Sequence, residues 1–154
     1  MVRACLLFMM MALGCSAFAG PFESCLNQVK KTDHRLARVE SIQSCFEKNK
    51  DLISDDACFA AIKKIQTHEK SIELSEKLNS ICFYDVSRFK TVDACLQKTA
   101  IFQIANNHDE ALFDCYRQFQ ADIQQKECLK ISSMMKYPAK KEYLQNHCYE
   151  NAAQ

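Results

Sequence analysis

The apolar residues of this chain recur with the period of an α-helix. Four stretches place them three, four or seven positions apart: Phe22, Cys25, Leu26 and Val29; Cys58, Ala61, Ile62 and Ile65; Leu74, Leu78, Ile81 and Cys82; and Leu112, Cys115 and Phe119. Residues at such spacings share one face of a helix, which then packs against a neighbour. The pattern therefore predicts paired helices with cysteines on their apolar faces.

Residues that break helices are scarce. Both glycines, Gly14 and Gly20, lie near the start, and Pro138 is the only proline after Pro21. Tight hairpins and phosphate-binding loops usually need glycine, because it tolerates positive φ. The sequence therefore predicts an all-α fold and argues against a nucleotide-binding loop.

The cysteines mark a fourfold repeat. Eight follow residue 19: Cys25, Cys45, Cys58, Cys82, Cys95, Cys115, Cys128 and Cys148. The intervals between them are 20, 13, 24, 13, 20, 13 and 20 residues. Phe or Tyr directly follows the second, fourth, sixth and eighth of these cysteines. Periods in the thirties are typical of two-helix units that stack. We expect four units, which begin near Cys25, Cys58, Cys95 and Cys128.

Each unit must fold back on itself if its two cysteines are bonded. A straight helix would separate cysteines 20 residues apart by about 30 Å, whereas a disulfide needs Cα atoms within about 7 Å. The midpoints of the intervals predict bends near Arg35, at Ala105 beside a turn over Asn106–Asp109 with Asp109 as a cap, and at Pro138. Ser54 and Thr91 are expected to cap the helices that follow them.

Parity favours one disulfide pattern. Pairing across the longer intervals uses all eight cysteines: Cys25–Cys45, Cys58–Cys82, Cys95–Cys115 and Cys128–Cys148. Pairing across the 13-residue intervals leaves Cys25 and Cys148 unpaired unless the array closes on itself. We predict the first pattern, in which each bridge stabilises the fold by about 3 kcal/mol.

The first 19 residues resemble a secretory signal peptide. Arg3 precedes an apolar run, and small residues at Ala17 and Ala19 form an A-x-A exit. We expect cleavage after Ala19, a helical repeat domain over residues 20–154, and a secreted or periplasmic location. A lipoprotein acylated at Cys15 is the alternative. Disulfides form in either oxidising compartment.

The charge and hydropathy of the chain limit the classes of partner that we expect. Without residues 1–19 the chain keeps 19 of its 20 basic residues against 19 acidic ones, and the two signs are interspersed. Nucleic acid is therefore not an expected partner. No later segment approaches the roughly 20 apolar residues of a membrane span. No motif for a cofactor is present, and we predict none.

Histidine provides the weak candidates for metal binding. His34, His68 and His108 fall in the predicted bends, each beside an acidic residue, and stacked bends would align three imidazoles. Exposed histidines in turns are the simpler interpretation, so we predict no metal site. His147 adjoins Cys148, but adjacent helical positions point about 100° apart and Cys148 is the expected bridge partner of Cys128, which argues against a catalytic dyad.

These observations favour a non-enzymatic module that binds an unknown protein or other macromolecule through an exposed helical face. A rigid, bridged fold lowers the entropic cost of such binding. The alternative is a carrier that holds a small apolar molecule between its helices.

Overall fold

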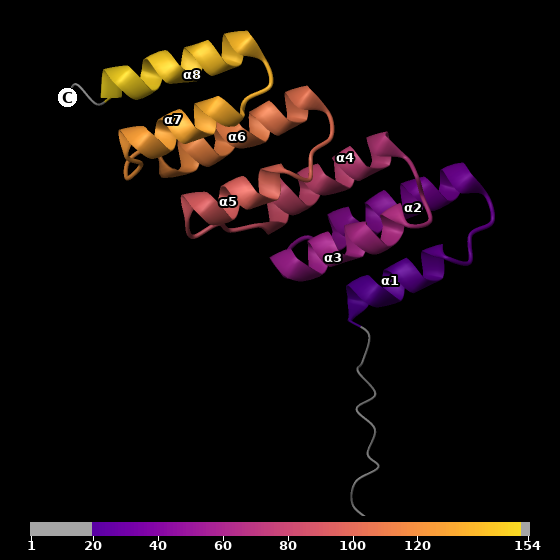
Figure 1. The fold of residues 1–154 in the computed structure, drawn as a ribbon. Helices are drawn as coiled ribbons and strands as arrows, with labels where there is room; N and C mark the ends of the chain where they lie inside the picture. The colour runs from indigo at the N-terminus through magenta and orange to yellow at the C-terminus, as the bar shows by residue number, and fades with distance from the viewer. Residues whose placement is uncertain (1–19, 152–154) are drawn as a thin grey trace, which may run out of the picture.

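The computed structural model describes residues 20–151, which form helices joined by short loops with no strand among them. Figure 1 shows the helices stacked in chain order from α1 at one end to α8 at the other. Their bounds are α1 Pro21–Val29, α2 Arg35–Asn49, α3 Asp55–Gln66, α4 Ile72–Ser80, η1 Ile81–Val86 (a π-helix), α5 Val92–Thr99, α6 Ala105–Phe119, α7 Gln125–Met134 and α8 Pro138–Asn151. The predicted signal peptide, with Cys15 and the cleavage point after Ala19, lies outside the described residues.

Four helical hairpins make up the array: α1–α2, α3–α4 with η1, α5–α6 and α7–α8. One disulfide closes each hairpin, and the pairs are Cys25–Cys45, Cys58–Cys82, Cys95–Cys115 and Cys128–Cys148. Their Cα atoms lie 5.7–5.8 Å apart, within the range that a disulfide spans. The predicted all-α array of disulfide-stapled two-helix units is confirmed.

The second helices share one register. Helices α2, α4, α6 and α8 each begin ten residues before the second cysteine of their unit. The four extra residues of the second unit lengthen its first helix: α3 ends eight residues beyond Cys58, whereas α1 and α5 end four residues beyond Cys25 and Cys95. The insertion therefore adds about one turn to α3 and leaves the second helices aligned.

The two predicted caps, Ser54 and Thr91, are confirmed, and the predicted breaker Pro138 lies at a helix start. The hydroxyl oxygens of Ser54 and Thr91 accept hydrogen bonds from the backbone N–H groups of Ala57 and Ala94, at 3.3 and 3.2 Å. Pro138 is the first residue of α8, where its missing N–H costs no helical hydrogen bond.

The predicted bend at Asn106–Asp109 is wrong. These residues form the first turn of α6, and the chain reverses over residues 100–104. Phe102 in this loop is buried in the core, which holds the bend there. Asp109 therefore caps no helix of its own unit; Ile104 is the N-cap residue of α6 and has no side chain that can accept a hydrogen bond.

A carboxylate from the preceding unit supplies the missing cap. Glu76 of α4 accepts hydrogen bonds from the N–H groups of Gln103 and Ile104, at 2.6 and 3.4 Å, immediately before α6. Asp109 of α6 accepts from Lys136 and Tyr137, both at 2.9 Å, immediately before α8. The positive end of a helix dipole favours a carboxylate at this point. We call this contact the carboxylate joint.

Glu76 and Asp109 hold the same place in the repeat, six residues before the second cysteine of their units. Val39 occupies that place in the first unit, where Arg38 of α2 instead bonds Glu69 in the loop before α4. Glu142 occupies it in α8, where it is exposed. A polar contact of the second helix thus joins each described pair of neighbouring units.

The electrostatic surroundings of Asp109 reflect this contact. Its side chain is fully buried, which by itself raises the pKa of the carboxyl group. The N–H groups of Lys136 and Tyr137 and the adjacent His108 outweigh burial, so the net pKa of Asp109 lies below its usual range. The carboxylate form is therefore the one that the joint stabilises.

Two apolar cores lie along the array. The first lies within the first two units and includes Phe46 and Leu78; the second lies within the last two and includes Leu112 and Leu144. Phe83 of η1 extends into the second core, where its ring lies 5.6 Å from that of Phe102. The π-helix thus directs an aromatic side chain from the second unit into the third.

Replacing Asp109 with alanine should lower the free energy of unfolding by about 2–3 kcal/mol, because two N–H groups at the start of α8 lose a charged acceptor. Glu142→Ala changes the same repeat position on the exposed face of α8 and should stay within about 0.5 kcal/mol of the parent. Denaturant unfolding measures both. Equal effects of the two substitutions would contradict the carboxylate joint.

The contribution of Asp109 should also vanish in acid. Since its folded pKa lies below the unfolded value of about 3.9, its stabilisation is complete above about pH 5 and is lost as the pH falls through the folded pKa. The gap in stability between the parent and Asp109→Ala should therefore narrow below about pH 4.

Candidate functional site

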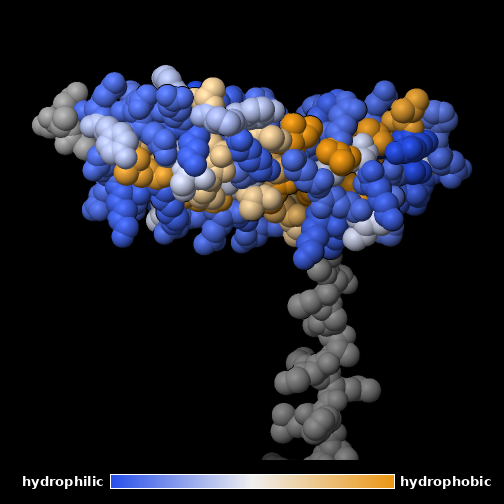
Figure 2. Space-filling model, turned by 45° about the horizontal axis from the view of Figure 1, so that its top comes forward, coloured by the Kyte–Doolittle hydropathy of each residue, from blue (hydrophilic) through white to orange (hydrophobic). Residues whose placement is uncertain are grey.

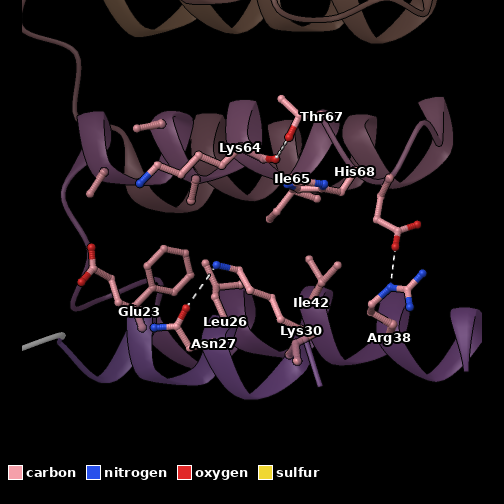
Figure 3. Close-up of a pocket in the computed structure, with 16 residues that line it drawn as sticks. Glu23, Leu26, Asn27, Lys30, Arg38, Ile42, Lys64, Ile65, Thr67 and His68 are labelled. Carbon is pink, nitrogen blue, oxygen red and sulfur yellow. Dashed lines mark hydrogen bonds and ion pairs between the residues drawn. The ribbon is translucent and has the colours of Figure 1, made fainter. Parts of the chain in front are cut away.

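A half-open groove of about 900 Å³ runs between α1 and α3, with α2 as its floor (Figure 3). Sixteen residues line it: Phe22, Glu23, Leu26, Asn27, Val29, Lys30, Arg38, Ile42, Ala57, Ala60, Ala61, Lys64, Ile65, Thr67, His68 and Glu69. Half of these side chains are apolar and half are polar or charged. Ligand sites in proteins commonly have this mixture.

Helical periodicity places the apolar walls. Leu26 and Val29 lie on the face of α1 that turns toward α3, and Ile42 of α2 is buried beneath them. On the opposite wall, Ala57, Ala60, Ala61 and Lys64 follow the spacing i, i+3, i+4, i+7 along one face of α3. Alanine side chains are short, so this wall leaves space between the two helices.

Lysines bridge the first helices of neighbouring units further along the array, between the second and third units and between the third and fourth. Lys98 of α5 pairs with Asp55 and Asp56 of α3 at 3.6 and 3.7 Å, and Lys130 of α7 pairs with Asp93 of α5 at 3.0 Å. These lysines stand two or three residues after the first cysteine of their units, and Asp56 and Asp93 stand two residues before theirs.

At the joint between the first two units, the lysine positions hold Ala60 and Ala61, and the acid position holds Glu23. All three residues line the groove, and Glu23 forms no ion pair with any described residue. The groove therefore occupies the place where a lysine side chain bridges the first helices elsewhere in the array.

Charged side chains lie at both ends of the groove. Figure 3 shows Glu23 and the ammonium groups of Lys30 and Lys64 toward one end, whereas Arg38 lies at the other. Arg38 donates hydrogen bonds to the carboxylate of Glu69 at 2.5 Å and to the carbonyl of Thr32 at 3.0 Å. The second end is thus closed by a satisfied ion pair, while the first end is open.

The three histidines considered for metal binding are not brought together as a metal site. His34 precedes α2 as its N-cap, His68 lies in the loop after α3 on the groove rim, and His108 is buried inside α6 against Asp109. The placement of His108 in a bend was wrong, for the reason given for Asn106–Asp109. Over residues 20–151, no group of three or more His, Cys, Asp or Glu side chains is arranged to hold a metal ion.

His147 and Cys148 make separate contacts and do not form a catalytic pair. Cys148 is bonded to Cys128, while the ring of His147 stacks on Tyr143 with centroids 6.2 Å apart and lies 3.7 Å from Glu150. The imidazole therefore belongs to an aromatic cluster between α6 and α8, with Tyr116 and Tyr143, and contacts no free thiol among the described residues.

The face of the molecule that Figure 2 shows is mainly hydrophilic, with apolar side chains among the hydrophilic ones. None of the helices in the described range is long and apolar enough to cross a membrane. Comparison with protein-family models, with curated proteins and with solved structures finds no match. The case for a function therefore depends on the geometry and charge of the groove.

Arg38→Ala should destabilise the protein by about 2–3 kcal/mol, because Glu69 is buried and would lose its main cationic partner. Arg117→Ala removes the exposed pair with Asp114 and should cost less than about 1 kcal/mol. Thermal unfolding compares the two. The double variant Arg38→Ala/Glu69→Ala should lose less than the sum of the single losses, and additive losses would show that the pair is not coupled.

Proposed function

We propose that this protein is a non-enzymatic extracellular binding protein that holds a small molecule with an apolar body in the groove between α1 and α3. The observation that carries this proposal is the groove itself. Its volume of about 900 Å³ lies within the range of roughly 300–1,000 Å³ that is usual for sites of small ligands. Apolar side chains form half of its lining, and charged side chains lie toward its two ends.

The covalent structure of the walls supports this role. One wall belongs to the hairpin closed by Cys25–Cys45, and the other to the hairpin closed by Cys58–Cys82. The bond between Arg38 and Glu69 ties the two units together at one end of the groove. A site that is already formed before binding loses little conformational entropy when the ligand enters.

The four disulfides fit an oxidising extracellular location. Export through a signal peptide cleaved after Ala19, to the periplasm or the medium, is part of the proposal. Sequencing the N-terminus of the exported protein tests that part separately, since a start at Gly20 is expected.

Docking of a partner protein is the second candidate. The groove is half-open, and an amphipathic helix can lie in an open apolar groove between two helices. Native mass spectrometry of protein purified from its own source separates the candidates. A bound mass of a few hundred daltons supports the small ligand, whereas protein without bound small molecules contradicts it.

Filling the groove should abolish binding of a neutral apolar probe. Ala60 lines the groove yet is exposed, so Ala60→Phe should leave the fold intact while its ring occupies the cavity. We expect the affinity for N-phenyl-1-naphthylamine, measured by fluorescence titration, to fall about tenfold, as for the loss of about 1.4 kcal/mol. Ala121→Phe, at an exposed position in the α6–α7 loop, is the matched control. Equal affinities of the two variants would contradict binding in this groove.

A further inference from the structure

We propose that the ligand of the groove is a free single-chain amphiphile with an anionic head group, such as an alkyl carboxylate, whose head lies between Lys30 and Lys64. The inference rests on the proposed function and specifies the chemistry of the ligand. Its basis is the distribution of satisfied and unsatisfied charges around the groove.

Lys30 and Lys64 present ammonium groups from opposite walls. Lys30 closes α1 and Lys64 lies in the last turn of α3, and both side chains are exposed at the rim. The ammonium group of Lys30 donates to the neutral amide oxygen of Asn27 at 3.2 Å. That of Lys64 has neither a hydrogen-bond acceptor nor an ion-pair partner among residues 20–151.

The other cation deep in the groove is already neutralised. Arg38 bonds both Glu69 and the carbonyl of Thr32, so it has little capacity to attract a second anion. Glu23 adds one carboxylate at the open end, but two ammonium groups outnumber it there. The open end therefore carries one net positive charge without a partner in the described chain.

The apolar interior begins beside these ammonium groups. Figure 3 shows Leu26, Ile42 and Ile65 between the lysine end and Arg38. A ligand that satisfies both regions has one negative group joined to an apolar chain. Burial of that chain would provide most of the affinity, since each buried CH₂ contributes about 0.8 kcal/mol.

The recessed position of the apolar residues favours a free amphiphile over a lipid within a bilayer. Ile42 is buried, and Leu26 and Ile65 are only partly exposed, so none projects outward to enter a membrane. A single chain released from a membrane or a micelle can reach the floor of the groove between α1 and α3.

Three probes with the same chain test the head-group charge in calorimetric titrations: dodecanoate and dodecyltrimethylammonium, each below its micelle concentration, and dodecanol below its solubility limit. Dodecanoate should bind tightest.

Variants of the charged residues test where the head group lies. Lys30→Gln and Lys64→Gln should each lower the affinity for dodecanoate about threefold and leave the affinity for dodecanol unchanged, as for a partly exposed ion pair. Glu23→Gln should raise the affinity for dodecanoate about twofold, since it removes a repulsive carboxylate. Lys126→Gln, on the exposed surface of α7, is the matched control and should change nothing.

A preference for the cationic probe over the anionic one overturns the inference. Tightest binding of dodecyltrimethylammonium, weakened by Glu23→Gln, would show a cationic ligand. Equal binding of all three probes that is lost in Ala60→Phe would leave the proposed function standing and remove the anionic head group. No binding of any probe would contradict both. Sedimentation with phosphatidylglycerol vesicles, in the absence of dodecanoate binding, would instead show membrane attachment and overturn the free amphiphile.

Discussion

The disulfide inside each hairpin is the constraint on which the array depends. It fixes one point of the first helix against a point ten residues into the second helix, and this register is the same in all four units. Because the register repeats, the residues six positions before the second cysteine of the second and third units both meet the loop of the next unit. Glu76 and Asp109 can therefore make the same contact, and the stacking of units follows from the closure of each unit.

Local features of the fold could be predicted from the sequence because they depend on neighbours along the chain. The helical period, the hairpin spacing and the caps at Ser54 and Thr91 are of this kind. The bend at Asn106–Asp109 could not be predicted, since the cap of α6 comes from Glu76, 27 residues before Gln103. Asn, His and Asp favour a turn in isolation, but burial of Phe102 moved the bend toward the apolar segment before them.

The groove could not be predicted from the repeat pattern alone. Similarity between the units predicted the architecture, whereas the groove arises where one unit differs from the others. Alignment of the four units by their cysteines already places Ala60 and Ala61 where Lys130 and Lys98 stand. The sequence therefore holds a signal for the site, but the volume between α1 and α3 depends on how the helices pack, which cysteine spacing does not determine.

Disulfide mapping tests the central constraint most directly. Proteolysis of the oxidised protein without reduction, followed by mass spectrometry of the linked peptides, should join Cys25 to Cys45, Cys58 to Cys82, Cys95 to Cys115 and Cys128 to Cys148. Such links close every hairpin within its own unit. A peptide linking Cys45 to Cys58 or Cys82 to Cys95 would place the bridges between units, and the common register of the second helices would then lose its physical cause.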